Sequence, residues 1–565
     1  MQKSNQRDTL RDKRSVPMAP AAIGILACLL AFVFTLESIH FPLSMRTDYS
    51  DSGIYQYIGH LLAIGKTPYV DAFDHKGIIF YAINMIGVLI SPKFGMWILE
   101  FIFMLADALL VYKLARRFAD RTVSVIACVI IISGLGSSFW IGNTPDFFAV
   151  TFCLAAFYFL SDELNNKRLS FINVFLSGIS TAIAFWMKPD MLVGTGALCL
   201  AILVLNIFKR NFSYCGKSVA AFLAGFAAVT IPVIIWFISR NALSEMIQDY
   251  FLFNFSYSAY HMTWSERLDA YVFFLTHPTV FLCILAILAY LISFIAVKDR
   301  TPEIKTMDIS MVCSIFIFIV SSVMCILPGN RYEQYGYLLY PSVLLIMIFT
   351  VNVYLSSETV KKKFLYTGLA AAGAVVFLLN LQKEITCIQS YWKENAEETA
   401  IEEYIVDNVD NDETIAAVTP RLTGLYLKTG RESATPNIYI QAQHFADFED
   451  DPAAFDEFWN LYIDQLSGSM PQLIIFDKSY EGSNAALEKL SGFLEESYIH
   501  AGESKHLDVY YRNDGSTGVP EFEYIGSSNS TELGTTRITD ELKEKYENGE
   551  LSEEEIADML LSDLS

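Results

Sequence analysis

The chain has 565 residues, of which 53% are hydrophobic, and its mean hydropathy is +0.35. That hydropathy is too high for a soluble protein of this length. The net charge is −22, and no segment is basic enough to indicate nucleic-acid binding. Apolar segments of about 17–25 residues, the length that crosses a bilayer, recur along the chain. We therefore predict a polytopic α-helical membrane protein.

The charge divides the chain into two parts. Residues 382–565 carry 39 acidic residues against 12 basic ones, whereas residues 1–381 carry 28 basic residues against 23 acidic ones. This division indicates a mildly basic membrane part followed by an acidic soluble part. The nine cysteines lie mostly inside or beside apolar segments and form no CxxC motif. They indicate neither a disulfide framework nor a zinc ribbon.

We expect about 11 membrane spans. The first apolar run, 18–36, follows five basic residues like a signal peptide, but no small-x-small cleavage site precedes Glu37. We interpret it as an uncleaved span that follows a cytoplasmic segment, 1–17. The run 77–90 has only 14 residues and is short for a span. The expected spans are 19–40, 94–115, 122–141, 146–161, 170–187, 190–208, 218–238, 278–297, 308–327, 336–355 and 364–381.

The basic residues predict the orientation of these spans through the positive-inside rule. If 77–90 lies on the membrane without crossing it, one side collects 20 basic residues and the other side eight. The larger set comprises Lys3, Arg7, Arg11, Lys13, Arg14, Lys113, Arg116, Arg117, Arg121, Lys167, Arg168, Lys209, Arg210, Lys217, Lys298, Arg300, Lys305, Lys361, Lys362 and Lys363. We predict a multi-pass protein of the cell membrane with a cytoplasmic N-terminus and an extracytoplasmic C-terminal part.

The first outer loop, 42–93, combines carboxylates with interfacial helices. Apolar residues at helical spacing over 54–62, ended by Gly65 and Pro68, predict a short amphipathic helix in the interface. Asp51 stands at its start, where helix capping and a catalytic role are alternative interpretations. Lys76 precedes the second short helix, 77–90, where it either snorkels to the interface or holds a phosphate.

Four further outer loops carry polar or aromatic residues. They are 143–146, 188–190, 250–264 and 329–335. Asp146 either caps the helix that follows it or acts as a second acid, and Lys188 either pairs with Asp190 or contacts a phosphate. Arg331 either snorkels or binds a phosphate through its guanidinium. Five loops that converge on one face are expected to build an active site at the lipid–water boundary.

The acidic part begins with a predicted extracytoplasmic α/β domain, 382–513. Strands are expected at 414–418, 472–476 and 507–512, and helices at 394–409, 453–466 and 484–496. This domain contains no glycine-rich phosphate loop and no nucleophile elbow. Residues 514–565 are acidic and rich in Ser, Gly and Thr, which is typical of a mobile tail or an isolated helix.

The first outer loop also carries a family resemblance. The pattern Asp51-Ser-Gly-Ile-Tyr-Gln-Tyr-Ile-Gly, then Gly65-Lys-Thr-Pro-Tyr and Asp71-Ala-Phe-Asp-His-Lys-Gly77, resembles this loop in GT-C membrane glycosyltransferases. It is most similar to the bacterial branch that includes protein O-mannosyltransferases and the lipid A aminoarabinose transferase. The resemblance covers about 18–381 and implies transfer of a sugar from a polyprenyl-phosphate donor to a cell-envelope acceptor hydroxyl, with inversion.

The resemblance implies roles for individual residues. Asp51 would be the base, with Asp48 as the fallback, and Asp146 a second catalytic acid. The substrate-binding set would comprise Lys76, Asp74, Arg331, Tyr335, Lys188 and Tyr55. A divalent metal is an open alternative, with Asp74, His75 and Asp146 as its candidate ligands; no other cofactor is implied. The family often has Lys-Pro-Pro where this chain has Lys76-Gly77-Ile78.

The partners implied are the polyprenyl-phosphate sugar, a glycan, lipid or protein acceptor and membrane lipids. The alternative function is a transporter or flippase for lipid-linked sugars. A transporter is expected to place its polar residues near the bilayer midplane, beside broken helices. Here the polar residues gather on one face, which favours the enzyme.

Overall fold

The structure is a computed structural model that describes residues 20–44, 51–139, 142–258, 263–296, 301–328, 330–356, 361–391, 396–440, 452–480, 483–515 and 518–522. Its described residues up to Glu521 belong to one compact unit, the first of the two into which the chain divides. The expected basic N-terminus, Asp48 and the acidic tail beyond 522 lie outside the described residues.

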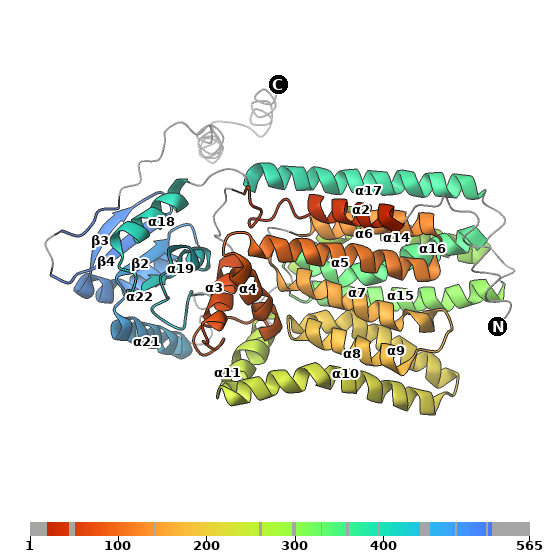
Figure 1. The fold of residues 1–565 in the computed structure, drawn as a ribbon, viewed down its shortest axis with the longest axis horizontal. Coiled ribbons are helices and arrows are strands. Elements are labelled where there is room, and N and C mark those ends of the chain that lie inside the picture. The colour runs from red at the N-terminus through yellow and green to blue at the C-terminus, as the bar shows by residue number, and fades with distance from the viewer. Residues whose placement is uncertain are drawn as a thin grey trace, which may run out of the picture. The chain divides into compact units, whose positions relative to one another are not determined.

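The first unit is built mainly from long helices that run side by side (Figure 1). They are α2 (Pro20–Val33), α5 (Gly95–Phe118), α6 (Arg121–Ser137), α7 (Pro145–Leu164), α8 (Phe171–Phe185), α9 (Leu192–Phe208), α10 (Phe212–Ser239), α14 (Pro278–Ala296), α15 (Pro302–Ile326), α16 (Tyr340–Ser356) and α17 (Lys362–Tyr391). We call this set the bundle.

Seven helices of the described residues are long and apolar enough to cross a membrane. They span Pro145–Leu164, Pro189–Phe208, Phe212–Ser239, Pro278–Ile295, Pro302–Ile326, Glu333–Ser356 and Lys362–Gln389. Four shorter apolar helices accompany them: α2, α6, α8 and the 13-residue helix Ile78–Ile90. The chain is therefore a multi-pass membrane protein.

Short helices join the long ones at one end of the bundle. They are α3 (Asp51–Ala63), α4 (Ile78–Ile90), the 3₁₀ helices η1 (Pro189–Met191) and η3 (Glu333–Leu339), α11 (Leu243–Met246), the π-helix η2 (Ile247–Leu252), α12 (Phe253–Ser258) and α13 (Trp264–Thr276). Helices α3 and α4 pack closely because Gly59 has no side chain. A Cβ there would lie 2.6 Å from the backbone nitrogen of Met85. The two short helices expected in the first loop are both present.

Residues 396–515, which we call the sheet region, form a four-stranded mixed sheet with helices. Its elements are α18 (Ala396–Asn408), β1 (Ile415–Ala417), η4 (Pro420–Leu422), α19 (Gly424–Thr429), α21 (Pro452–Ser469), β2 (Leu473–Asp477), α22 (Ser483–Ser497), β3 (Tyr498–Glu503) and β4 (Leu507–Arg512). The strand order is β1-β2-β4-β3, with β1 parallel to β2 and the other neighbours antiparallel. All five residues of β2 are buried, as expected of a central strand. Strand β3 had no counterpart among the expected elements.

The sheet region contacts α3 directly (Figure 1). The ring centroids of Tyr57 on α3 and Tyr426 on α19 lie 4.7 Å apart. The backbone N–H of Ser433 donates to the hydroxyl of Tyr57 at 2.8 Å. The N–H of Phe73, in the loop after α3, donates to the carbonyl of Pro436 at 2.8 Å. The sheet region therefore borders α3 and the loop after it, which together carry Asp51, Tyr55, Asp74, His75 and Lys76.

Candidate active site

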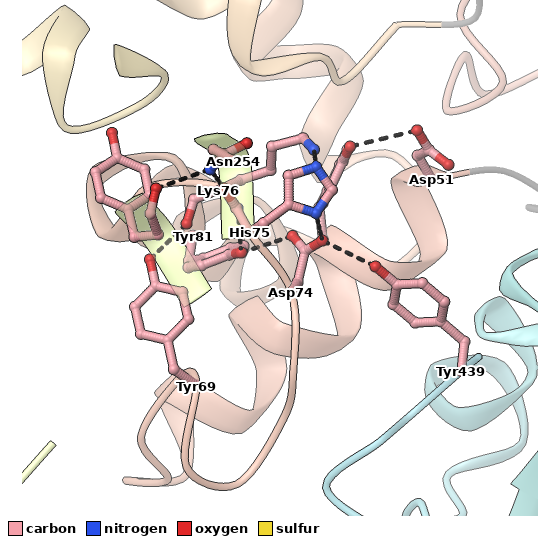
Figure 2. Close-up of polar contacts among 10 residues, drawn as sticks. Asp51, Tyr69, Asp74, His75, Lys76, Tyr81, Asn254 and Tyr439 are labelled. Atoms are coloured by element: carbon pink, nitrogen blue, oxygen red, sulfur yellow. Dashed lines mark hydrogen bonds and ion pairs between the residues drawn. The ribbon is translucent and has the colours of Figure 1, made fainter. Parts of the chain in front are cut away.

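The candidate site forms where the loop between α3 and α4 meets the ends of the bundle helices. Asp51 and Tyr55 lie on α3, while Asp74, His75 and Lys76 lie in the loop before α4. Asp146 lies in the first turn of α7. Lys188 lies between α8 and η1, and Tyr335 on η3. Figure 2 shows the part of this cluster around Asp74.

Asp74 is buried and has hydrogen-bond donors on both carboxylate oxygens. Tyr81 of α4 donates to Oδ2 at 2.6 Å, and Tyr439 of the sheet region donates to Oδ1 at 3.0 Å. The Nδ1 atom of His75 lies 3.5 Å from Oδ1. Burial alone would raise the pKa of Asp74, but the charge of Lys76 and the Tyr81 hydrogen bond outweigh it, and the pKa is lowered. Asp74 is therefore held as a carboxylate.

His75 connects Asp74 to Lys76 (Figure 2). Burial and the neighbouring ammonium of Lys76 lower the pKa of His75 to about 3, so its ring is neutral. With Nδ1 facing the carboxylate, Nε2 is left to accept a hydrogen bond from the Lys76 ammonium. Burial also lowers the pKa of Lys76, while Asp74 and Asp51 act in the opposite direction.

The backbone of the loop is held at Lys76. Its N–H donates to the Tyr81 hydroxyl at 3.0 Å, and its carbonyl accepts from the Tyr69 hydroxyl at 2.5 Å. Tyr69 itself has φ of +72°, a strained backbone conformation for a residue other than glycine. Gly77 follows in close contact with Trp186, since a Cβ there would lie 1.9 Å from the Trp186 carbonyl oxygen. This contact explains why a glycine stands at position 77.

Asp51 is the exposed carboxylate of the cluster. It is the first residue of α3, and the Tyr55 hydroxyl lies 3.4 Å from its Oδ2. The ring of Tyr55 lies 6.0 Å from the Lys76 ammonium. On the other side, burial and the charge of Asp51 raise the pKa of Tyr332, just before η3. An exposed carboxylate bordered by two tyrosines and near a lysine can accept a proton from a bound hydroxyl group.

Lys188 and Asp146 form the second charged group. The Lys188 ammonium lies 2.8 Å from Asp146, 3.3 Å from Asp190 and 4.1 Å from the ring centroid of Tyr335. Burial would lower the pKa of Lys188, but the two carboxylates outweigh it and raise the pKa. The cap of α7 is Thr144, whose side chain accepts the N–H of Phe147. Asp146 is therefore free of the capping role and engaged by Lys188.

Arg331 does not join the cluster. Its guanidinium lies 3.5 Å from Asp269 on α13, and the two side chains are 62% and 60% exposed. The neighbouring Tyr332 and Tyr335 do belong to the cluster, Tyr332 near Asp51 and Tyr335 beside Lys188. Their rings lie 5.6 Å apart. The loop 330–335 thus contributes aromatic rings, and its arginine points to another carboxylate.

Metal coordination has no obvious set of ligands here. Within the part of the chain that the structure describes, no three His, Cys, Asp or Glu residues are grouped as a metal site. Asp74 and His75 are adjacent, but Asp74 receives two tyrosine hydroxyls and Asp146 pairs with Lys188.

Several polar residues in this region were assigned no role from the sequence. Asn143 donates at 2.7 Å to both Ser52 on α3 and Asn84 on α4, and His40 contacts Ser52 at 2.7 Å. Asn254 of α12 donates to the His75 carbonyl at 2.7 Å. Tyr439 reaches Asp74 from 365 residues away in the chain. Asn143 and Asn254 lie in two of the outer loops that the sequence singled out, but their partners, like those of His40 and Tyr439, are revealed only by the fold.

Comparison with solved structures places this fold among known ones. ArnT from Cupriavidus metallidurans bound to undecaprenyl phosphate matches with a TM-score of 0.54 and 13% identity, over 87% of this chain and 98% of ArnT. Its apo state matches with a TM-score of 0.57, 12% identity and the same coverage. A more distant match is the archaeal oligosaccharyltransferase AglB from Archaeoglobus fulgidus, in complex with an inhibitory peptide and a dolichol-phosphate. Its TM-score is 0.49, with 12% identity over 88% of this chain and 75% of AglB.

ArnT is a lipid A aminoarabinose transferase of the GT-C fold, so the resemblance found in the sequence is confirmed at the level of the fold. Comparison of the sequence with curated proteins gives no significant match. Residues 11–346, more than half of the chain, match the family model "Putative competence-induced protein Ccs4 N-terminal domain". The chain belongs to this family, and it has the GT-C fold.

Proposed function

We propose that this protein is a membrane glycosyltransferase that moves a sugar from a polyprenyl-phosphate donor to an acceptor hydroxyl. The observation that carries the proposal is the cluster of Asp51, Lys76, Asp146 and Lys188. Four separate segments supply these residues at one end of the bundle. The fold that it shares with ArnT, which was solved with undecaprenyl phosphate, supports a lipid-phosphate donor.

The proposed reaction is an inverting displacement. The carboxylate of Asp51 takes the proton of the acceptor hydroxyl, whose oxygen forms the new bond to the anomeric carbon. The bond from that carbon to the phosphate oxygen breaks, and the lipid phosphate leaves with the electron pair. The ammonium of Lys76 stabilises the negative charge on the departing phosphate. The ring of Tyr55 and the carboxylate of Asp74 lie near the Lys76 ammonium, and the negative charge of Asp74 favours its charged form.

Lys188 is assigned the second cationic role. It is paired with Asp146 and Asp190 and so carries less free charge than Lys76. We propose that it orients the substrates together with Tyr335 and Asp146. Arg331 is exposed and paired with Asp269. In this proposal it contacts the donor phosphate only after its side chain has left Asp269.

The proposed function includes a particular orientation of the protein in the membrane. Eleven spans, a cytoplasmic N-terminus and an extracytoplasmic domain at 382–513 put the cluster at the outer surface of the membrane. Eleven spans require α2, α5, α6 and α8 in addition to the seven long apolar helices, although α2, α6 and α8 have only 14, 17 and 15 residues. Cysteines placed singly at Lys66 and at Arg331 should react with an impermeant maleimide added outside intact cells. Labelling only after permeabilisation would contradict this orientation.

A flippase for lipid-linked sugars is the alternative function. The cluster lies at the first residues of α3 and α7 and in the loops beside α4 and η1, and such helix-end positions favour an enzyme over midplane transport. The decisive experiment is mass spectrometry of the cell envelope with the gene, without it and with Asp51→Asn. The proposal expects one glycan modification to be lost in both altered strains. Retention of that modification in the Asp51→Asn strain would contradict the assignment of Asp51 as the catalytic base.

A further inference from the structure

The carboxylate of Asp74 is held by residues from two separate parts of the fold. Tyr81 comes from α4, next to the bundle, whereas Tyr439 comes from the sheet region (Figure 2). Tyr439 is 2% exposed, and its ring also packs near Phe73, with centroids 6.4 Å apart. Because each tyrosine takes a different oxygen, the two together define the orientation of the carboxylate.

The contacts continue from Asp74 to the lysine. The Oδ1 atom that accepts from Tyr439 is the same atom that lies 3.5 Å from His75 Nδ1. The other ring nitrogen of His75 contacts the ammonium of Lys76. A continuous series of polar contacts therefore runs from the sheet region to the cation proposed to meet the donor phosphate.

The segment that carries Tyr439 is itself fixed on both sides of the site. Pro436 accepts a hydrogen bond from the N–H of Phe73, the residue before Asp74, and Ser433 donates to Tyr57 of α3. The buried ring of Tyr439 packs near Phe73, whereas its hydroxyl makes the polar contact with Asp74. The two parts of the side chain can therefore be tested separately. Such a hydrogen bond between a hydroxyl and a carboxylate is charge-assisted, and at 3.0 Å it is the longer of the two that Asp74 accepts from tyrosines.

We propose that Tyr439 is a positioning residue, through which the sheet region holds Asp74, His75 and Lys76 in the arrangement that receives the donor phosphate. The inference rests on the proposed function for the identity of the ligand. The sheet region is then part of the site, because it fixes the carboxylate next to the phosphate-binding lysine.

The test measures Lys76 directly in the full chain, in detergent or nanodiscs. Acetylation of Lys76 by acetic anhydride, followed by mass spectrometry across pH, reports its pKa without any ligand. Asp74 raises the pKa of Lys76, so releasing Asp74 in Tyr439→Phe should lower this pKa further. General loosening that admits water would raise it toward the ordinary value. A raised or unchanged pKa in Tyr439→Phe would overturn the proposal.

Two matched variants complete the test. Tyr426→Phe also removes a tyrosine hydroxyl at this interface, bonded to the Ile438 carbonyl at 3.0 Å, but it does not touch Asp74. It should leave the pKa of Lys76 unchanged. In an Asp74→Asn background, Tyr439→Phe should have no further effect, because the two residues act through one contact. Independent, additive shifts would also overturn the proposal.

Undecaprenyl phosphate serves as the binding probe. Tyr439→Phe should weaken its binding about tenfold, the effect of losing about 1.4 kcal/mol of interaction with a charged group. If the wild-type protein does not bind the probe, the proposed function fails. The acetylation measurement then still decides whether Tyr439 positions Lys76, so the two failures are distinguishable.

Discussion

Lys188 and Asp146 form a buried ion pair that joins the segment after α8 to the first turn of α7. Their Nζ and Oδ1 atoms lie 2.8 Å apart, and their side chains are only 16% and 3% exposed. A charge at such a site is stable only with its partner, because few water molecules are available to solvate it. The pair is therefore expected to matter for the stability of the fold as well as for the site.

The first prediction concerns this pair. Lys188→Met should lower the free energy of unfolding by about 3–5 kcal/mol, since it leaves the Asp146 carboxylate buried without its nearest cation. The double variant Lys188→Met with Asp146→Asn should recover most of that loss. Thermal unfolding of the purified protein in one detergent compares the three proteins. An unchanged midpoint in Lys188→Met would show that the pair contributes little to stability.

The second prediction concerns the proposed base. Asp51→Asn should slow glycosyl transfer by about 10²- to 10⁴-fold, the usual contribution of general base catalysis. Its unfolding midpoint should change little, because the side chain is exposed at the start of α3. Asp456→Asn is a matched control, since this exposed carboxylate lies on α21 and pairs with Lys489 at 2.9 Å. The control should retain the transfer rate of the wild-type protein.

The third prediction concerns pH and His75. The unfolded chain binds a proton on this histidine below about 6.5, whereas the folded protein binds it only near 3. Between these values the unfolded state holds more protons, so the free energy of unfolding should fall as the pH drops from about 6.5 toward 3. Thermal midpoints across this range should decline less steeply in His75→Gln than in the wild-type protein. Parallel curves would contradict the low pKa of His75.

The fourth prediction concerns the loop backbone at Gly77. In Gly77→Ala the new methyl group would overlap the Trp186 carbonyl oxygen, so the loop or the end of α8 must shift. We expect a lower unfolding midpoint together with weaker binding of undecaprenyl phosphate, because Lys76 precedes this residue. Gly368→Ala on α17 is the matched control, since among the described residues nothing beyond its own stretch of helix lies within 4 Å of the position that its new methyl group would take. In a helix interior that change should stabilise by up to about 1 kcal/mol.

Much of the membrane part could be predicted from the sequence because burial in lipid is a property of each segment. Apolar runs marked the long helices, and the run 77–90 corresponds to the 13-residue helix α4. The spacing of apolar residues after Asp51 placed the start of α3, where the structure also begins this helix. Expected strands at 414–418, 472–476 and 507–512 correspond in position to β1, β2 and β4.

The candidate site could be predicted only in part. Asp51, Asp74, Lys76, Asp146 and Lys188 stand out as charged residues at the ends of apolar runs, and the fold brings them together. Arg331 stood out in the same way, yet it pairs with Asp269. Interfaces tolerate a basic residue at many positions, so its presence alone does not identify the anion that it meets.

By itself, the sequence determined that this chain crosses a membrane repeatedly and carries the charged residues of the candidate site at the ends of its apolar runs, because hydropathy and charge act residue by residue. Only the tertiary structure decided which side chains share a site. Tyr439 reaches Asp74 across 365 residues, and Gly77 meets Trp186. Hydrogen bonds and close contacts of this kind act over about 3 Å, so they depend on how helices and sheet dock.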